Sequence, residues 1–117
     1  MKFMIAMYTV PDDSVALSPE QLSEIELKHS RFRERLEASG TLLNGAGLEF
    51  RRESLVLHEG HGRNDGLNCT EGNRAEMTAF YVVECQSTET AAALASELLD
   101  DHVVAVDVRG IHHSNGM

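Results

Sequence analysis

The clearest pattern of apolar and polar residues lies in the first third of the chain. Residues 18–38 carry apolar side chains at helical spacings of three, seven and four positions, at Leu22, Ile25, Phe32 and Leu36. This spacing predicts an amphipathic helix. Ser18 is suited to the N-cap, Pro19 to the first helical position and Gln21 to a capping box. Gly40 is suited to the left-handed stop, so we expect the helix to end near residue 38.

Alternating or continuous apolar runs predict strands elsewhere. The expected strands cover residues 2–9, 41–50, 54–59, 78–85 and 103–109. Gly45 and Gly47 interrupt the second of these and indicate a bulge or a close backbone approach. A second helix should follow the cap at Ser87, with its stripe at Ala91, Leu94, Ala95, Leu98 and Leu99. The run Asn64-Asp65-Gly66 predicts a hairpin turn within residues 54–70, although residues 60–76 are polar enough to form a loop instead.

The order strand, helix, two or three strands, helix, strand predicts an α+β, ferredoxin-like βαββαβ fold in one domain, residues 1–117. Two helices cover one face of such an antiparallel sheet. In the last strand we expect Val104, Val106 and Val108 on one face. The other face keeps apolar residues, expected at Met4, Tyr8, Val103 and Ala105. A second copy would bury this face, so we expect a homodimer packed sheet to sheet.

Composition excludes several classes of function. The net charge is −9, which argues against binding the phosphate backbone of nucleic acids. No apolar run approaches the ~20 residues of a membrane span, and the N-terminus lacks a signal-peptide cleavage site. The two cysteines form no metal or redox motif, so we expect a reduced, cytoplasmic protein. No nucleotide-binding loop or nucleophile elbow occurs.

One histidine interrupts the apolar stripe of the first helix. His29 lies four residues after Ile25 and three before Phe32, where a histidine is either a buried structural residue or a pocket residue. Arg33 and its charged neighbours have mixed signs at helical spacing, which favours a solvated helix face. Four other histidines, His58, His61, His112 and His113, could ligate a metal, but exposed loop positions are the more ordinary interpretation.

Three segments resemble the YCII-related family of small dimeric α/β-barrel proteins. They are LSPEQL with HSRFRERLEASGTLLNGAGL, FYVVECQSTETAAALASELL, and VAVDVRGI. The segment from Thr70 to Met77 departs from the family because it lacks the Pro-Phe pair and the Gly pair, and Gly110 stands where proline is usual. The resemblance implies the ferredoxin-like dimer. A few members of the family resemble muconolactone isomerases and act as dehalogenating lyases on chloromuconolactones, with a helix histidine in the pocket.

The resemblance also implies site residues. In one branch of the family a helix histidine, here His29, pairs with an aspartate after the second helix, here Asp100, with Asp101 beside it. Such a histidine would act as acid and base, without cofactor or metal, on a small lactone or carbonyl substrate. Tyr8 and Arg109, on the face away from the helices, are candidate ligand-binding donors for the developing enolate. The alternative is a non-catalytic dimer that binds a small ligand or serves as an accessory protein.

Overall fold

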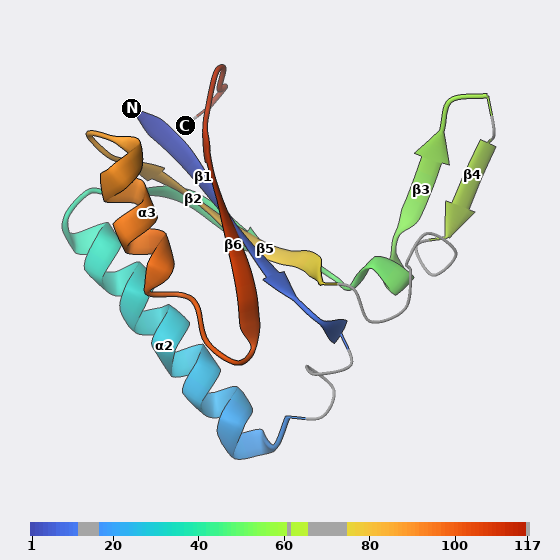
Figure 1. Cartoon of the computed structure of the whole chain (residues 1–117), viewed down its shortest axis with the longest axis horizontal. Helices are drawn as coiled ribbons and strands as arrows, with labels where there is room; N and C mark the ends of the chain where they lie inside the picture. The colour runs from blue at the N-terminus through green and yellow to red at the C-terminus, as the bar shows by residue number, and fades with distance from the viewer. Residues whose placement is uncertain (12–16, 61, 66–74, 117) are drawn as a thin grey trace.

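The computed structural model describes residues 1–11, 17–60, 62–65 and 75–116. Its helices are α2 (Pro19–Ala38) and α3 (Thr88–Ser96), with a 3-10 turn η1 (Arg51–Glu53). Its strands are β1 (Lys2–Thr9), β2 (Leu42–Gly47), β3 (Leu55–His58), β4 (Gly62–Asp65), β5 (Glu76–Glu84) and β6 (Val103–Gly110). Four strands form one sheet in the order β2-β5-β1-β6, and every neighbouring pair is antiparallel. Both helices lie on the same side of this sheet (Figure 1). The predicted ferredoxin-like fold is confirmed.

Local sequence signals account for the helix ends. The Ser18 hydroxyl accepts a hydrogen bond from Gln21 N at 3.1 Å, and the Gln21 side chain accepts one from Ser18 N at 2.8 Å. This capping box is the predicted one. At the other end Gly40 adopts φ +74°, a conformation that glycine enters without a Cβ penalty. The second helix begins at its predicted cap, Ser87, but it ends at Ser96. The predicted stripe position Leu99 therefore lies beyond the helix and is 45% exposed.

The hydrophobic core lies between the sheet and the two helices. Alternate residues of β1 point into it, and so do the apolar faces of both helices. Its buried members are Phe3, Ile5, Met7, Phe32, Leu36, Tyr81, Val83, Cys85, Ala91, Ala95, Leu98 and Val103. Aliphatic and small side chains dominate this set, so packing of α3 depends on alanines that let the helix approach the sheet closely.

The last strand departs from simple alternation. Tyr8 pairs with Ala105, whereas the next residue, Thr9, pairs with Val103, so Val104 is an extra residue in β6. This bulge turns Val103 toward the helices, where it is 3% exposed, and leaves Val104 45% exposed. The predictions that Val103 lies on the open face, and that Val104 shares a face with Val106, were therefore wrong. A bulge is set by the pairing of two strands, which a period-two pattern does not reveal.

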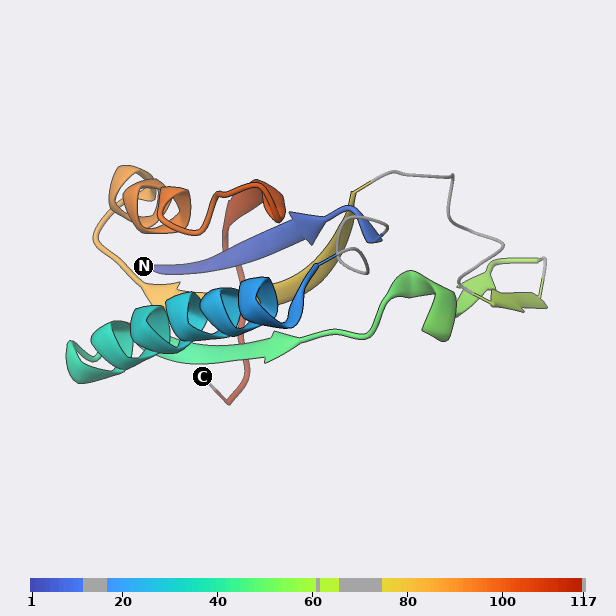
Figure 2. The same cartoon turned by 90° about the horizontal axis from the view of Figure 1, so that it is seen from below.

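The hairpin of β3 and β4 forms a separate two-stranded sheet. It stands apart from the main body in both views (Figures 1 and 2). Residues 59–61 connect its strands, and Gly60 adopts φ +74°. The hairpin predicted within residues 54–70 is present, but Asn64 and Asp65 belong to β4 and not to its turn. Residue 66 lies outside the described residues. The projecting hairpin helps to explain a radius of gyration of 15.6 Å, against about 13 Å for a compact chain of this length.

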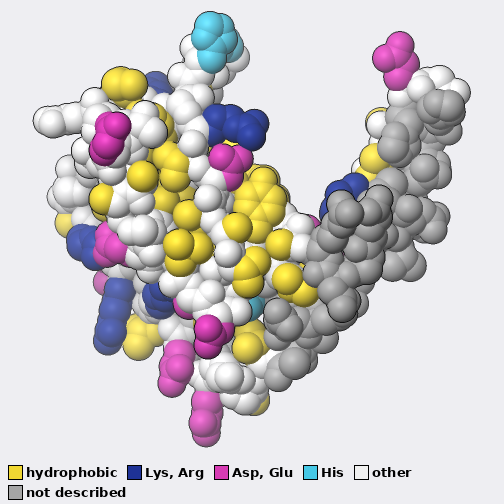
Figure 3. Space-filling model, in the orientation of Figure 1, with side chains coloured by type: hydrophobic (Ala, Val, Ile, Leu, Met, Phe, Trp, Pro, Cys, Tyr) yellow, Lys and Arg dark blue, Asp and Glu magenta, His cyan; other side chains and the backbone are white. Residues whose placement is uncertain are grey.

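The face of the main sheet away from the helices carries apolar side chains. Strand register places Met4, Tyr8 and Phe80 there, each partly exposed. In the view of Figure 3, apolar side chains gather over the crossing of the central strands, beside the hairpin.

Among the described residues, no helix is both long enough and apolar enough to cross a membrane.

Candidate functional site

A pocket of about 560 Å³ opens between α2 and the sheet. One wall comes from α2, where His29, Arg33 and Glu37 line the pocket. These residues are four positions apart, so successive turns of the helix place their side chains one above another. The apolar stripe with Phe32 and Leu36 runs beside them and is buried. The core packing of α2 therefore fixes the direction in which the polar wall faces.

The sheet side of the pocket is built around a glycine. Gly45 of β2 lies opposite Tyr81 of β5 in the strand register. A Cβ at position 45 would lie 2.8 Å from Cδ1 of the Tyr81 ring and 3.0 Å from the Phe80 carbonyl oxygen. The absence of a side chain at Gly45 therefore leaves space for the tyrosine ring. The predicted close backbone approach in this strand is found at this position.

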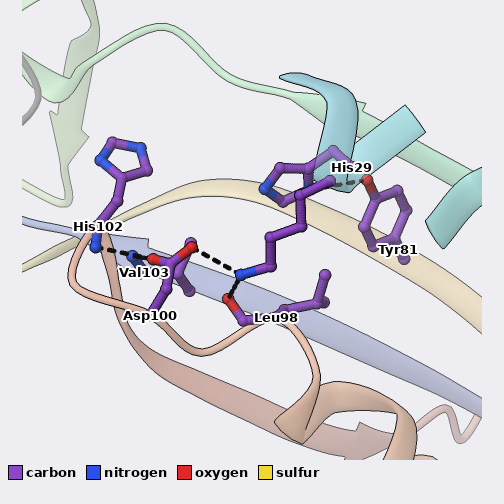
Figure 4. A network of polar contacts seen from close by, with 7 residues as sticks. His29, Tyr81, Leu98, Asp100, His102 and Val103 are labelled. Carbon is purple, nitrogen blue, oxygen red and sulfur yellow. Dashed lines mark hydrogen bonds and ion pairs between the residues drawn. The ribbon is translucent and has the colours of Figure 1, made fainter. Parts of the chain in front are cut away.

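Tyr81 joins two of the α2 residues through its hydroxyl group. His29 Nδ1 lies 3.3 Å from the Tyr81 hydroxyl oxygen, and Arg33 Nη1 donates to the same oxygen at 3.3 Å. The tyrosine is only 5% exposed, and its ring packs on Phe32 with centroids 5.2 Å apart. Figure 4 shows the tyrosine hydroxyl facing the His29 ring. A buried ring with a polar tip thus holds the imidazole of a partly exposed histidine in place.

The surroundings of His29 favour its neutral form. Burial is the largest cause of a lowered pKa, and the positive charges of Lys28 and Arg33 add to it. Asp100 acts in the opposite direction but does not outweigh them. The pKa of His29 therefore lies below the ordinary value of 6.5, and at neutral pH the ring carries a free lone pair that can accept a proton.

The structure does not join Asp100 to His29 by a hydrogen bond. Asp100 Oδ1 accepts from the backbone N–H groups of His102 at 2.7 Å and Val103 at 2.6 Å. Its Oδ2 accepts from Lys28 Nζ at 2.6 Å. Burial opposes ionisation of Asp100, but these hydrogen bonds outweigh it and leave its pKa below the ordinary value. Both oxygens of this carboxylate are thus occupied by the loop and by Lys28.

The two predicted donors lie on the other face of the sheet. Tyr8 pairs with Ala105, and Arg109 pairs with Met4, so both side chains point away from the helices. Arg109 is exposed and forms an ion pair with Asp107 at 3.0 Å. Within one chain, neither residue belongs to the pocket that contains His29. Their placement on the open face agrees with the alternation of the strands, and their role in ligand binding stays a prediction.

Comparison with known proteins places the chain in a family. The family model of the YCII-related domain matches residues 1–98. The chain belongs to the YCII-related family. A solved structure of 5-chloro-2-hydroxyhydroquinone dehydrochlorinase from Burkholderia phenoliruptrix, in complex with 2,5-dihydroxybenzoquinone, is 16% identical, with a TM-score of 0.48. That match covers 97% of this chain and 96% of the other. No curated protein matches this YCII-related sequence.

Among the polar pocket residues of this YCII-related protein, the sequence did not point to Tyr81 or His102, and Arg33, which was assigned to a solvated helix face, lines the pocket. Arg33 lies one helical turn after His29, and this spacing was the available signal. Tyr81 stands in an apolar strand, but only the strand register reveals that it faces Gly45. His102 follows two aspartates in a short loop, where no periodicity applies.

The four histidines considered as metal ligands are only partly described. His61 lies outside the described residues, and only the backbone of His58 is described. His112 and His113 are exposed beyond the end of β6. Among the described residues of this YCII-related chain, no three His, Cys, Asp or Glu side chains are grouped as metal ligands would be.

Proposed function

We propose that this protein is a lyase or isomerase without cofactor that uses His29 to move a proton on a small lactone or other carbonyl compound. The observation that carries the proposal is the position of His29 in the pocket, with a lowered pKa and Tyr81 at 3.3 Å. A buried structural histidine would be walled off from any cavity. The converging polar groups Arg33 and Tyr81 also favour a site that binds a polar ligand.

The chemistry begins with proton removal at the carbon next to the carbonyl group. The C–H bond breaks, its electron pair moves toward the carbonyl carbon, and an enolate oxygen forms while His29 gains the proton. An isomerase returns this proton to a different carbon. In a lyase the electron pair instead expels a leaving group from the adjacent carbon. Either outcome leaves the histidine neutral again after the proton is returned or lost to solvent.

Tyr81 sets which nitrogen of His29 is the base. When Nδ1–H donates to the Tyr81 oxygen, Nε2 keeps its lone pair and is the nitrogen that can accept a proton from a substrate. The same oxygen accepts from Arg33, so the tyrosine O–H hydrogen is free to donate to the enolate. In this arrangement Tyr81 orients the base and stabilises the developing charge.

Proton exchange tests the proposal without knowledge of the natural substrate. Two probes are used in D₂O: levulinate, an oxo acid, and α-angelica lactone, which isomerises when a proton moves from C3 to C5. The wild-type protein should accelerate deuterium uptake or isomerisation of at least one probe, and His29→Gln should lower this acceleration about 100-fold. His113→Gln is the matched control at an exposed histidine. No acceleration of either probe, or a rate that His29→Gln leaves unchanged, contradicts the proposal.

We also propose that two copies pair through the open face of the main sheet. Met4, Tyr8 and Phe80 are partly exposed there, and a chain in water gains stability when such a surface is covered. Sedimentation equilibrium should give twice the 12.9 kDa mass of one chain. Phe80→Glu should shift the mass toward one chain, since it would bury a charge in the interface. Glu89→Gln, on the exposed surface of α3, is the control, and a wild-type mass of one chain rejects the dimer.

A further inference from the structure

His102 is a second histidine in the pocket that contains His29. It lies in the loop between α3 and β6, two residues after Asp100, and its side chain is partly buried. Its Nδ1 atom is fully buried and has no hydrogen-bond partner among the described residues. Nε2 is therefore the ring nitrogen that remains available to a bound molecule. The proposed proton acceptor, His29, belongs to α2, on the other side of the pocket (Figure 4).

The position of the hydrogen on the His102 ring follows from this burial. A neutral imidazole carries one hydrogen, on either Nδ1 or Nε2. A hydrogen on Nδ1 would leave a buried N–H without an acceptor, an arrangement that folded proteins rarely contain. A hydrogen on Nε2 buries only a lone pair and presents an N–H donor toward the pocket. Such a donor binds an oxygen acceptor, and a carbonyl oxygen is one such group.

A clamp holds the His102 loop against α2. Lys28 donates through Nζ to Asp100 Oδ2 at 2.6 Å and to the Leu98 carbonyl oxygen at 2.9 Å. Asp100 Oδ1 in turn accepts from the backbone N–H groups of His102 and Val103. Lys28 is the neighbour of His29 in sequence, so the clamp ties the helix turn that carries one histidine to the loop that carries the other (Figure 4).

We propose that His102 donates a hydrogen bond through Nε2–H to the carbonyl oxygen of a small oxo acid or lactone, and that Asp100 and Lys28 position it. This inference rests on the proposed function, because His29 supplies the base that removes the proton next to that carbonyl group. The two histidines then have different roles. His29 accepts the proton from carbon, and His102 stabilises the negative charge that develops on the carbonyl oxygen. Asp100 is a positioning residue for His102.

The first test follows the histidine ring signals by NMR while levulinate is added. The ring signals of His29 and His102 should both move, whereas those of His112 and His113, outside the pocket, should not. Without levulinate, ¹⁵N shifts should show the His102 hydrogen on Nε2. Movement of His29 alone, or a hydrogen on Nδ1 of His102, overturns the proposal.

The second test compares variants in the deuterium exchange of levulinate. His102→Leu should slow exchange roughly 100-fold, and His102→Gln, which keeps an N–H donor, should recover about tenfold of that loss. A purely structural role would not distinguish the two variants in this order. Equal rates for His102→Leu and the wild type overturn the proposal.

The clamp has its own matched pair of variants. Asp100→Asn should shift the His102 ring signals and slow exchange, whereas Asp101→Asn, one position along the same loop, should change neither. If His29→Gln loses exchange and His102→Leu keeps it in full, the proposed role of His102 is rejected and His29 remains the proposed base. Exchange that survives His29→Gln would instead reject the proposed function itself.

Discussion

Gly45 offers a direct test of how the sheet positions the tyrosine of the pocket. A methyl group at this position would lie 2.8 Å from Cδ1 of Tyr81 and 3.0 Å from the carbonyl oxygen of Phe80. Ordinary contact begins at 3.4 Å, so in Gly45→Ala the ring must move by about 0.6 Å or the strands must separate. The hydrogen bond between His29 Nδ1 and the Tyr81 hydroxyl oxygen is already 3.3 Å long. A shift of this size breaks it when the ring moves away from α2.

The energetic cost follows from two opposing effects. Overpacking costs about 1–3 kcal/mol, and replacing glycine recovers about 0.4–1 kcal/mol by restricting the unfolded chain. We therefore expect Gly45→Ala to lower the free energy of unfolding by roughly 1–2 kcal/mol, measured by urea denaturation. Gly47→Ala is the control in the same strand, because a Cβ there meets no atom within 4 Å. It should leave stability unchanged or slightly raised.

NMR of the His29 ring gives the second readout of the same substitution. In the wild type the hydrogen should lie on Nδ1, held by the tyrosine oxygen, and in Gly45→Ala the ring should lose this preference. The reasoning is refuted when Gly45→Ala is as stable as Gly47→Ala and the His29 signals are the same in both variants.

Two further predictions concern pH and the helix cap. The pKa of His29 in the folded protein should lie below 6.5. Between that pKa and 6.5 the unfolded chain binds more protons than the folded one, so the free energy of unfolding should decrease as pH falls through this window. His29→Gln should reduce this pH dependence when the free energy of unfolding is measured against pH. Ser18→Ala removes the hydrogen bond from Gln21 N and should cost about 1 kcal/mol in urea denaturation, whereas equal stability would show that the capping box contributes nothing.

The start of both helices, the end of α2 and the order of the elements along the chain could be predicted because their signals are local, whereas the end of α3 at Ser96 was not predicted. Ser18 and Ser87 each form a hydrogen bond within three residues of themselves, and Gly40 ends a helix by its own backbone freedom. Spacing along the sequence likewise predicted Phe32 and Leu36 on the buried stripe of α2, although Leu22 of the same predicted stripe is 45% exposed. These features need no knowledge of which segments meet in space, so the sequence was sufficient for the ferredoxin-like arrangement.

The pocket depended on contacts between distant segments. Tyr81 faces His29 only because β5 pairs with β2 at Gly45. The position of Val103 depends on a bulge opposite β1, and the partners of Asp100 include a lysine in the other helix. His29 could be predicted as a pocket candidate, since a polar residue on an apolar stripe is visible locally. The groups around it could not, because sequence separation hides their proximity.

The separate hairpin has a consequence for how stability is distributed in the molecule. Its two strands share no backbone ladder with the main sheet, and Leu55 and Leu57 are 63% and 76% exposed. An isolated two-stranded unit of this kind is marginally stable, so it can open and close while the rest of the chain stays folded. None of its described residues lines the pocket. Changes in the length or sequence of the hairpin can therefore accumulate without altering the chemistry of the pocket.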